Sequence, residues 1–310
     1  MSLYTELMPN MARDFTEELS MAAFSWLYLS AASLCSASLS LLMRFFSSAK
    51  KSRYEMILGN YLTCSFVGFL LINDKALIFH SHPSTYLCGL IGGILFVLSL
   101  LCMQHSIETD GAILTSAFSK LGLLVPLLLS IAVFGEKPAL TQAIGLCTLI
   151  AAIFIFSYEQ NSIKDSRKIH LFFLLIVLLT GGAADAMAKV YDIIGIRNED
   201  SVYILLVFFF ASILTFVLSQ RELKQTHQEH SLRDLAYGVL IGIPNYFSSV
   251  FLLKALNGLP AFIVYPVFSC SAVIIVTLLS LFFFHEVLSR RQLAGLILIL
   301  VSLALALLNL

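Results

Sequence analysis

Two charged side chains interrupt long apolar segments of the sequence and are the strongest candidates for chemistry. Lys120 ends the run Thr115-Ser116-Ala117-Phe118-Ser119-Lys120, with no acidic residue within one helical turn. Asp185 lies in another apolar segment, four residues before Lys189, so both would face the same side of a helix. A charge near the middle of a membrane helix costs about 2.5–3.5 kcal/mol on insertion scales. Each of these side chains therefore needs a partner, water or a function.

The chemistry that these charges favour is the binding of a polar ligand. Lys120 can hold the negative group of a substrate, or it can face a hydrated cavity or the carbonyl groups of another helix. Asp185 and Lys189 can form an ion pair that satisfies itself, or they can take part in ligand binding or proton movement. Ser116 and Ser119 add hydroxyl groups beside Lys120.

Further polar groups are predicted at membrane depth beside two prolines. Tyr265 directly precedes Pro266, and Asn245 and Tyr246 follow Pro244. A proline inside a helix frees a carbonyl group and bends the helix, which is typical of binding regions in membrane proteins. The predicted substrate-binding residues are Lys120, Asp185, Lys189, Asn245, Tyr246, Tyr265, Ser116 and Ser119.

Other chemistries find little support in the sequence. It contains no nucleotide-binding G-x-x-x-x-G-K-[ST] loop, no C-x-x-C pair, and no histidines at metal-binding spacing. Asp185 is the one acidic residue that we place away from the ends of a predicted span. This disfavours an intramembrane enzyme, and a channel would need a symmetric polar ring. We expect no catalytic residues, no metal and no other cofactor; an intramembrane enzyme or channel is the alternative from a different class.

The composition indicates a membrane protein that crosses the bilayer several times. Of 310 residues, 59% are hydrophobic and 12% are charged, whereas a soluble domain has roughly 45–50% and about 25%. The mean hydropathy is +0.91. Nineteen basic residues balance nineteen acidic ones, which argues against nucleic acid as a partner. The lipid bilayer is therefore the expected environment.

Ten apolar segments are long enough to cross the bilayer, which requires about 20 residues for a helix. They are continuously apolar and do not alternate, so they predict helices and not barrel strands. The predicted spans are Ala23–Phe46, Tyr54–Asn73, Ser84–His105, Gly111–Phe134, Ala139–Tyr158, Ile169–Tyr191, Val202–Gln220, Leu235–Ala255, Ala261–Phe284 and Arg291–Leu310.

The sequence repeats itself at an offset of 150 residues. Leu128-Leu129-Ser130 aligns with Leu278-Leu279-Ser280, and Phe134-Gly135-Glu136 aligns with Phe284-His285-Glu286, without a gap. Two halves of five spans must enter the membrane from opposite sides because five is odd, which predicts an inverted repeat. The predicted divisions are an N-terminal tail (1–22), a first five-helix repeat (23–158), a linker (159–168) and a second five-helix repeat (169–310).

These features resemble the drug/metabolite transporter superfamily, and the EamA-like domain is the closest pattern. The residues that carry the resemblance are Gly135-Glu136 and His285-Glu286 at the end of the fourth helix of each half, each followed by a helix with an internal glycine, Gly145 or Gly295. His285 replaces the usual glycine. The resemblance implies a monomeric secondary transporter, not an enzyme, that works by alternating access. We expect it in the cell (inner) membrane of a bacterium.

Loop charges predict the orientation of the chain. The basic residues on one side are Arg44, Lys50, Lys51, Arg53, Lys164, Arg167, Lys168, Arg221, Lys224, Arg233, Arg290 and Arg291. Those on the other side are Arg13, Lys75, Lys137, Arg197 and Lys254. The positive-inside rule then places the first set in the cytoplasm and both termini outside.

The charges inside the spans also predict a class of substrate. A small amino-acid-like zwitterion or organic anion would fit, with its negative end at Lys120, in a cavity lined by the first, third, fourth, sixth, eighth and ninth spans. Asp185 could couple transport to protons. The alternative is a multidrug or organic-cation exporter of the same fold, which Lys120 disfavours because it would repel a cation in a medium of low dielectric constant.

Overall fold

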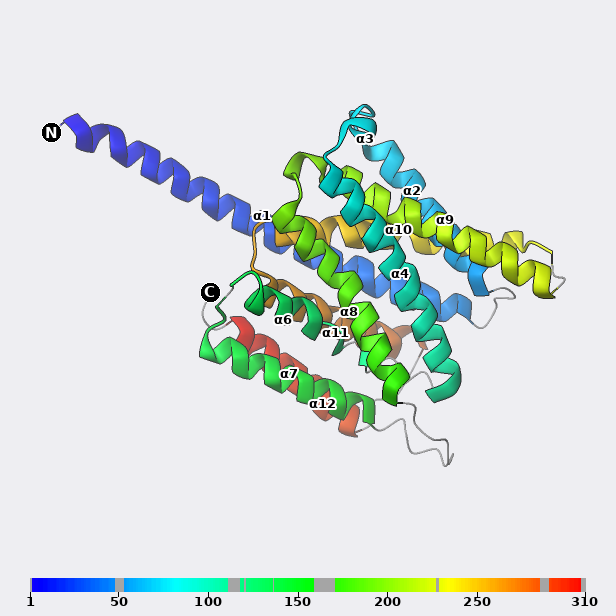
Figure 1. Ribbon diagram of the computed structural model, residues 1–310. Helices are drawn as coiled ribbons and strands as arrows, with labels where there is room; N and C mark the ends of the chain where they lie inside the picture. Colours follow the sequence, from blue (N-terminus) through cyan, green and yellow to red (C-terminus); the bar gives the residue numbers. More distant parts are fainter. Residues whose placement is uncertain are drawn as a thin grey trace.

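All regular secondary structure is helical in the residues that the computed structural model describes, which are all except 1, 48–52, 111–117, 120, 136, 159–170, 227–228, 285–289 and 308–310. The helices are α1 (Ser2–Ser47), α2 (Arg53–Leu71), α3 (Leu77–His80), α4 (Pro83–Asp110), α6 (Leu124–Ala132), α7 (Leu140–Tyr158), α8 (Leu171–Ile194), α9 (Asp200–Thr226), α10 (Leu232–Leu256), α11 (Ala261–Phe284) and α12 (Arg290–Leu307), with a 3-10 turn at Arg197–Glu199. The bundle and the long first helix are drawn in Figure 1.

Seven described helices are long and apolar enough to cross a membrane, in α1, α2, α4, α8, α9, α10 and α11. Each coincides with a predicted span. The helices α7 and α12 contain shorter apolar stretches, Leu140–Ala152 and Leu293–Ser302, and α6 covers part of the predicted fourth span. The count of ten spans therefore stays a prediction. Residues 2–22, expected as a tail, continue α1 as helix.

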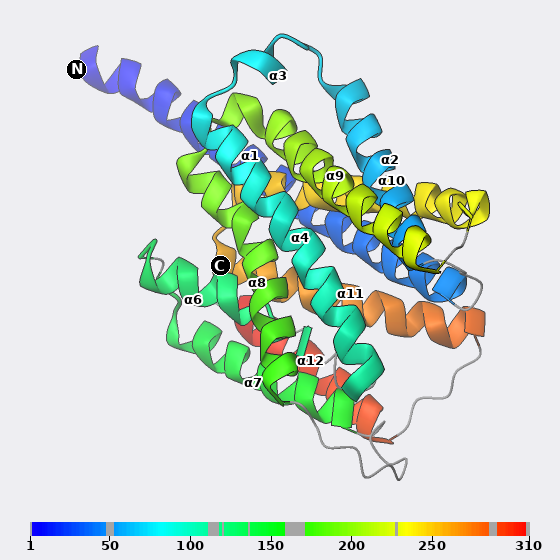
Figure 2. The same cartoon turned by 45° about the vertical axis from the view of Figure 1, so that its right-hand side comes forward.

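Eight of the long helices form two groups of three and an outlying pair, and α11 packs against α1. Helix α10 packs against both α1 and α2, and α4 packs against both α8 and α9. Contacts between α2 and α9 join the two groups, and α7 packs along α12. Figure 2 shows α2 beside α10, and α7 beside α12.

Glycines bring helices together at backbone distance in both groups. A Cβ atom on Gly238 of α10 would lie 2.3 Å from the carbonyl oxygen of Met56 on α2. A Cβ atom on Gly93 of α4 would lie 2.7 Å from the carbonyl oxygen of Val207 on α9. Small residues allow such close approach in membrane helices. The helix pairs α2/α10 and α4/α9 therefore depend on these glycines.

A buried carboxylate fastens one end of the bundle, which we call the Glu55 end. Glu55 lies in the first turn of α2 and is fully buried. Its Oε1 lies 2.7 Å from His230 Nδ1, and its Oε2 accepts a hydrogen bond of 2.6 Å from the backbone N–H of Ser231. Ser231 is the N-cap of α10, so Glu55 ties the start of α2 to the start of α10.

A second buried carboxylate fastens the opposite end, which we call the Glu199 end. Glu199 immediately precedes α9 and is 7% exposed. Its two oxygens accept from the backbone N–H of His82 at 3.1 and 3.0 Å. It also accepts from the hydroxyl of Thr85, in the first turn of α4. Glu199 therefore joins the start of α9 to the start of α4, where a carboxylate also complements the helix dipole.

Candidate functional site

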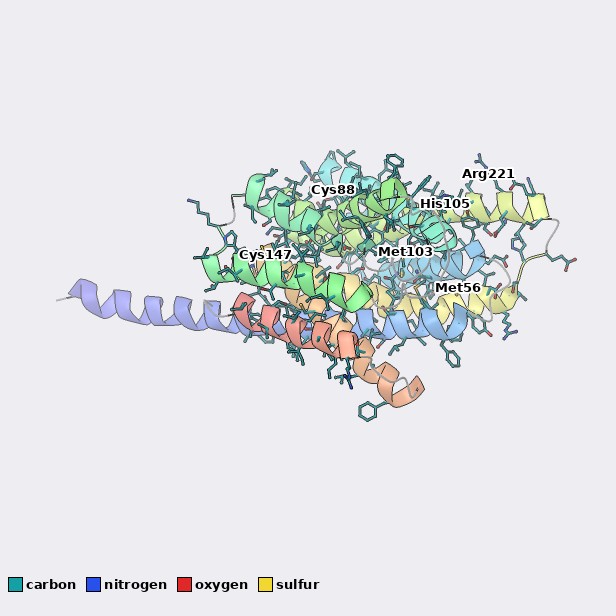
Figure 3. The ribbon with its side chains drawn as sticks, turned by 90° about the horizontal axis from the view of Figure 1, so that it is seen from below. Met56, Cys88, Met103, His105, Cys147 and Arg221 are labelled. Atoms are coloured by element: carbon teal, nitrogen blue, oxygen red, sulfur yellow. The ribbon has the colours of Figure 1, made fainter. Side chains whose placement is uncertain are left out.

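A cavity of about 210 Å³ opens between the two groups of helices. Its lining residues are Leu39, Met43, Met56, Ile57, Asn60, Tyr61, Phe96, Ser99, Leu100, Met103, Ser119, Gly181, Ala184, Asp185, Ile241 and Asn245. Two of these, Met56 of α2 and Met103 of α4, are labelled in Figure 3.

The cavity occupies the half of the bundle towards the Glu55 end. Its residues on α1 and α4 come from the last part of each helix, and those on α2 come from the first three turns. Helix α4 ends beside the start of α8, where His105 and Phe173 pack with ring centroids 4.8 Å apart. Figure 3 places His105 and Met103 towards the same end as Met56 and Arg221, with Cys88 on the other side.

Amide groups form the polar part of one wall. Asn245 Nδ2 of α10 donates a hydrogen bond of 3.1 Å to Asn60 Oδ1 of α2, and both residues line the cavity. Asn60 Oδ1 also lies 3.7 Å from Cys64 Sγ. The pair keeps polar groups at membrane depth where an unsatisfied amide would be costly.

A carboxylate lies on the wall formed by α4 and α8. Asp185 is the exposed residue of the stretch 181–189, all of which the structure describes. It lines the cavity together with Ser99 of α4. The α8 backbone is fixed at this residue, because the hydroxyl of Tyr265 on α11 donates a hydrogen bond of 2.9 Å to the Asp185 carbonyl oxygen. The cavity thus has a carboxylate on one wall and an amide pair on the other.

A smaller pocket of about 40 Å³ adjoins the cavity and shares Phe96, Ala184 and Asp185 with it. The remaining lining residues are Ala188, Tyr203, Ile204, Val207, Phe208, Ser249, Leu252 and Leu253. Ala188 lies about one turn of α8 beyond Asp185, roughly 5 Å further towards the Glu199 end.

The half of the bundle towards the Glu199 end is filled with aromatic and ionic groups. Tyr191 and Tyr203 stack with ring centroids 3.9 Å apart and an interplanar angle of 5°. Lys189 Nζ lies 3.1 Å from Asp192 Oδ2, and the two side chains are 7% and 9% exposed. These contacts pack the space that would otherwise continue the cavity to this end.

Three of the predicted binding residues line the cavity: Asp185, Asn245 and Ser119. Two others, Tyr246 and Tyr265, are each 2% exposed and are not among the lining residues. Pro244 lies one position before Asn245 inside α10, as predicted.

The remaining predicted residues lie elsewhere or are not described. Lys189 makes the ion pair with Asp192, about one turn further along α8. Lys120 and Ser116 lie outside the described residues, so their role stays a prediction. Within the described residues, no group of three His, Cys, Asp or Glu side chains could hold a metal ion.

Sequence reasoning missed Asn60, Tyr61 and Ser99, which line the cavity. Asn60 could have been found, because an amide inside an apolar segment needs a partner as much as Asn245 does. Tyr61 and Ser99 carry no such signal, since tyrosine and serine are common in membrane helices.

Comparison with known proteins identifies the fold and a family domain in the second half of the sequence. Residues 168–308 match the EamA-like transporter family. A solved structure, described only as the crystal structure of a protein, superposes with a TM-score of 0.70 at 14% identity and covers 93% of this chain and 96% of that chain. That likeness concerns the fold alone. No curated protein matches the chain.

The family match agrees with the helical bundle, the membrane-spanning helices and the central cavity. EamA-like proteins are secondary transporters and not enzymes. Residues 168–308 therefore match an EamA-like transporter domain of the drug/metabolite transporter superfamily, and the chain is an integral membrane protein that crosses the bilayer several times.

Proposed function

We propose that the protein carries a small zwitterionic, amino-acid-like metabolite across the cell membrane by alternating access. The observation that carries this proposal is the cavity in which the Asp185 carboxylate stands opposite the Asn60–Asn245 amide pair. A carboxylate attracts an ammonium group, and hydrogen bonds to a charged group are about twice as strong as neutral ones. The amides offer both donors and acceptors to the rest of a polar ligand.

The size of the cavity favours a metabolite over a drug. Pockets for drug-sized ligands have volumes of about 300–1,000 Å³, whereas this cavity has about 210 Å³. Multidrug export would also favour a mainly aromatic, apolar wall, but amide, hydroxyl and carboxylate groups share the lining here. Both points disfavour the exporter of large organic cations.

The two charged candidates would bind opposite ends of a zwitterion. Asp185 would hold the ammonium group, and Lys120 would hold the carboxylate, as the sequence predicts. A simple organic anion would lack a group for Asp185 and would experience repulsion from it. A zwitterion therefore has an opposite charge for both Asp185 and Lys120, whereas an anion has one for Lys120 alone.

Alternating access is supported by contacts that occur in matched pairs. Let α1 correspond to α8, α2 to α9, α4 to α10 and α6 to α11. The contact between α2 and α10 then corresponds to the contact between α9 and α4. The contact between α1 and α10 likewise corresponds to the contact between α8 and α4. The contacts α1/α11 and α8/α6 correspond in the same way. Such a correspondence is expected from two inverted five-helix repeats.

The predicted orientation indicates the side of the membrane towards which the cavity lies. The Glu55 end carries the loops with most basic residues, so we assign it to the cytoplasm. The cavity lies in the half towards this end, while stacked tyrosines fill the other half. The conformation thus corresponds to a state in which a substrate would bind from the cytoplasm.

Counterflow in liposomes tests the proposal. Purified protein is reconstituted in vesicles loaded with a mixture of neutral amino acids, and exchange with an external radiolabelled amino acid is measured. We expect exchange that neutral amino acids inhibit, that lipophilic cations leave unchanged, and that Lys120→Ala abolishes. Lys75→Ala, which alters an exposed loop lysine, is the matched control and should exchange normally. Exchange of cationic dyes by wild type and Lys120→Ala alike would contradict the proposal.

A further inference from the structure

The small pocket beyond Asp185 has the shape and chemistry of a subsite for part of the substrate. It shares Phe96, Ala184 and Asp185 with the main cavity, so a ligand held at Asp185 can reach both spaces. Six of its eight remaining lining residues are apolar: Ala188, Ile204, Val207, Phe208, Leu252 and Leu253. The pocket is therefore more apolar than the main cavity, where amide, hydroxyl and carboxylate groups share the lining with apolar side chains.

The volume of the pocket limits what it can hold. A water molecule needs about 10–15 Å³ of this kind of volume, so the 40 Å³ available accommodates about three heavy atoms. That is the size of the branched end of a leucine or isoleucine side chain and is too small for an aromatic ring. Filling such a pocket with hydrocarbon buries apolar surface, and each buried methylene tightens binding roughly fourfold.

The position of the pocket matches the geometry of an amino acid. Ala188, which lines it, lies about one helical turn, roughly 5 Å, beyond Asp185 along α8. An α-amino group is separated from the end of a short branched side chain by about this length. A ligand with its ammonium group at Asp185 would thus direct its side chain towards Ala188, Ile204 and Leu252.

Resting on the proposed function, we infer that this pocket selects substrates with a short branched aliphatic side chain and that Ala188 and Ile204 determine that selection. The transported class is then neutral aliphatic amino acids or close analogues. Polar side chains would lose hydrogen bonds to water in this pocket. Aromatic side chains would need the pocket to expand against Phe208, which is fully buried.

Substitutions that shrink or enlarge the pocket test the inference. In the counterflow assay, wild type should bind leucine at least about tenfold more tightly than alanine. Ala188→Leu should remove this preference by weakening leucine binding about tenfold while leaving alanine unchanged. Ile204→Ala enlarges the pocket and should improve phenylalanine as a competitor. Ala236→Leu, at an exposed position of α10, is the matched control and should behave as wild type.

The failure of the pocket and the failure of the proposed function give different results. Exchange of leucine and alanine with equal affinity, or equal losses for both in Ala188→Leu, would overturn the selective pocket. If no amino acid is exchanged, the proposed function fails, and thermal stabilisation of purified protein by simple amines decides the pocket alone. Stronger stabilisation by isopentylamine than by ethylamine, lost in Ala188→Leu, supports the pocket; equal stabilisation by the two amines overturns it.

Discussion

Glu55 and Glu199 make corresponding contacts at opposite ends of the bundle. Each lies at the start of a helix, α2 or α9, and each accepts hydrogen bonds from residues at the start of another helix, α10 or α4. The residues that they bind, His230-Ser231 and His82, precede α10 and α4. The spacing of the two carboxylates, 144 residues, and of the two histidines, 148 residues, is close to the offset of the sequence repeat.

The space behind the two carboxylates differs far more than the carboxylates themselves. Behind Glu55 lie the amide pair and the cavity. Behind Glu199 lie the stacked Tyr191 and Tyr203 and the ion pair of α8. The carboxylates hold helices together at both ends of the bundle. The side chains packed between the two ends determine which half of the bundle is open.

Among the residues that the structure describes, the largest effect on transport is expected at Asp185, where the open and filled halves of the bundle meet. Asp185→Asn keeps the size of the side chain but removes the charge that we assign to the ammonium group, so transport should fall by roughly tenfold to a hundredfold. Counterflow measures the loss, and the melting temperature of the purified variant should stay near that of wild type. Asp74→Asn, in an exposed loop, serves as the control.

The same variant tests coupling to protons. If Asp185 exchanges protons during transport, the residual activity of Asp185→Asn should no longer depend on pH as wild type does. A wild-type pH dependence in Asp185→Asn would rule out the proton role and leave the binding role intact.

The accessibility of two positions on α4 to a thiol reagent can be compared between the open and the filled half of the bundle. Ser99 lines the cavity, whereas Cys88 is 3% exposed near the Glu199 end. In a variant that keeps Cys88 and has the other cysteines replaced by alanine, Ser99→Cys should react with a maleimide at least about tenfold faster than Cys88, which requires local opening. Mass spectrometry of the labelled peptides measures both rates. Equal rates would contradict the difference between the halves.

The two carboxylates should differ in their contribution to stability. Glu199→Ala leaves the fully buried Thr85 hydroxyl without its acceptor, which should cost about 2–4 kcal/mol. Glu55→Ala affects His230, whose side chain is 53% exposed and can bind water, so we expect a smaller cost of about 1–2 kcal/mol. Thermal unfolding in detergent should rank the variants in this order. Glutamine at either position keeps an acceptor and should restore part of the loss.

The sequence predicted the helices better than the site. Long apolar segments carry their own signal, so seven predicted spans reappear as helices that could cross a membrane. Asn245 was found because it follows a proline, but its partner Asn60 lies 185 residues away, and no local pattern reports such a contact. Tyr265 was expected in the cavity; instead its hydroxyl binds the Asp185 carbonyl oxygen. Long-range packing decides which polar groups remain available to a ligand.

The smallest effect is expected from substitutions of two neighbouring glycines of α8, Gly181 and Gly182. A Cβ atom on Gly182 would lie 2.3 Å from the Gly122 carbonyl oxygen and 2.5 Å from a methyl carbon of Val125. A Cβ atom on Gly181 would meet only Ser99 Oγ, at 3.4 Å. Alanine gains about 1 kcal/mol of helix propensity at either position, but overpacking costs typically 1–3 kcal/mol.

Gly182→Ala should therefore lower the melting temperature, while Gly181→Ala should leave it unchanged or raise it slightly. The backbone of Gly122 cannot yield as a flexible side chain could, so the overpacking cost at Gly182 outweighs the gain in propensity. Thermal unfolding of the two variants in the same detergent measures the difference. Equal melting temperatures would mean that α8 and residues 122–125 separate easily, and would weaken the view that glycines set the spacing of helices around the cavity.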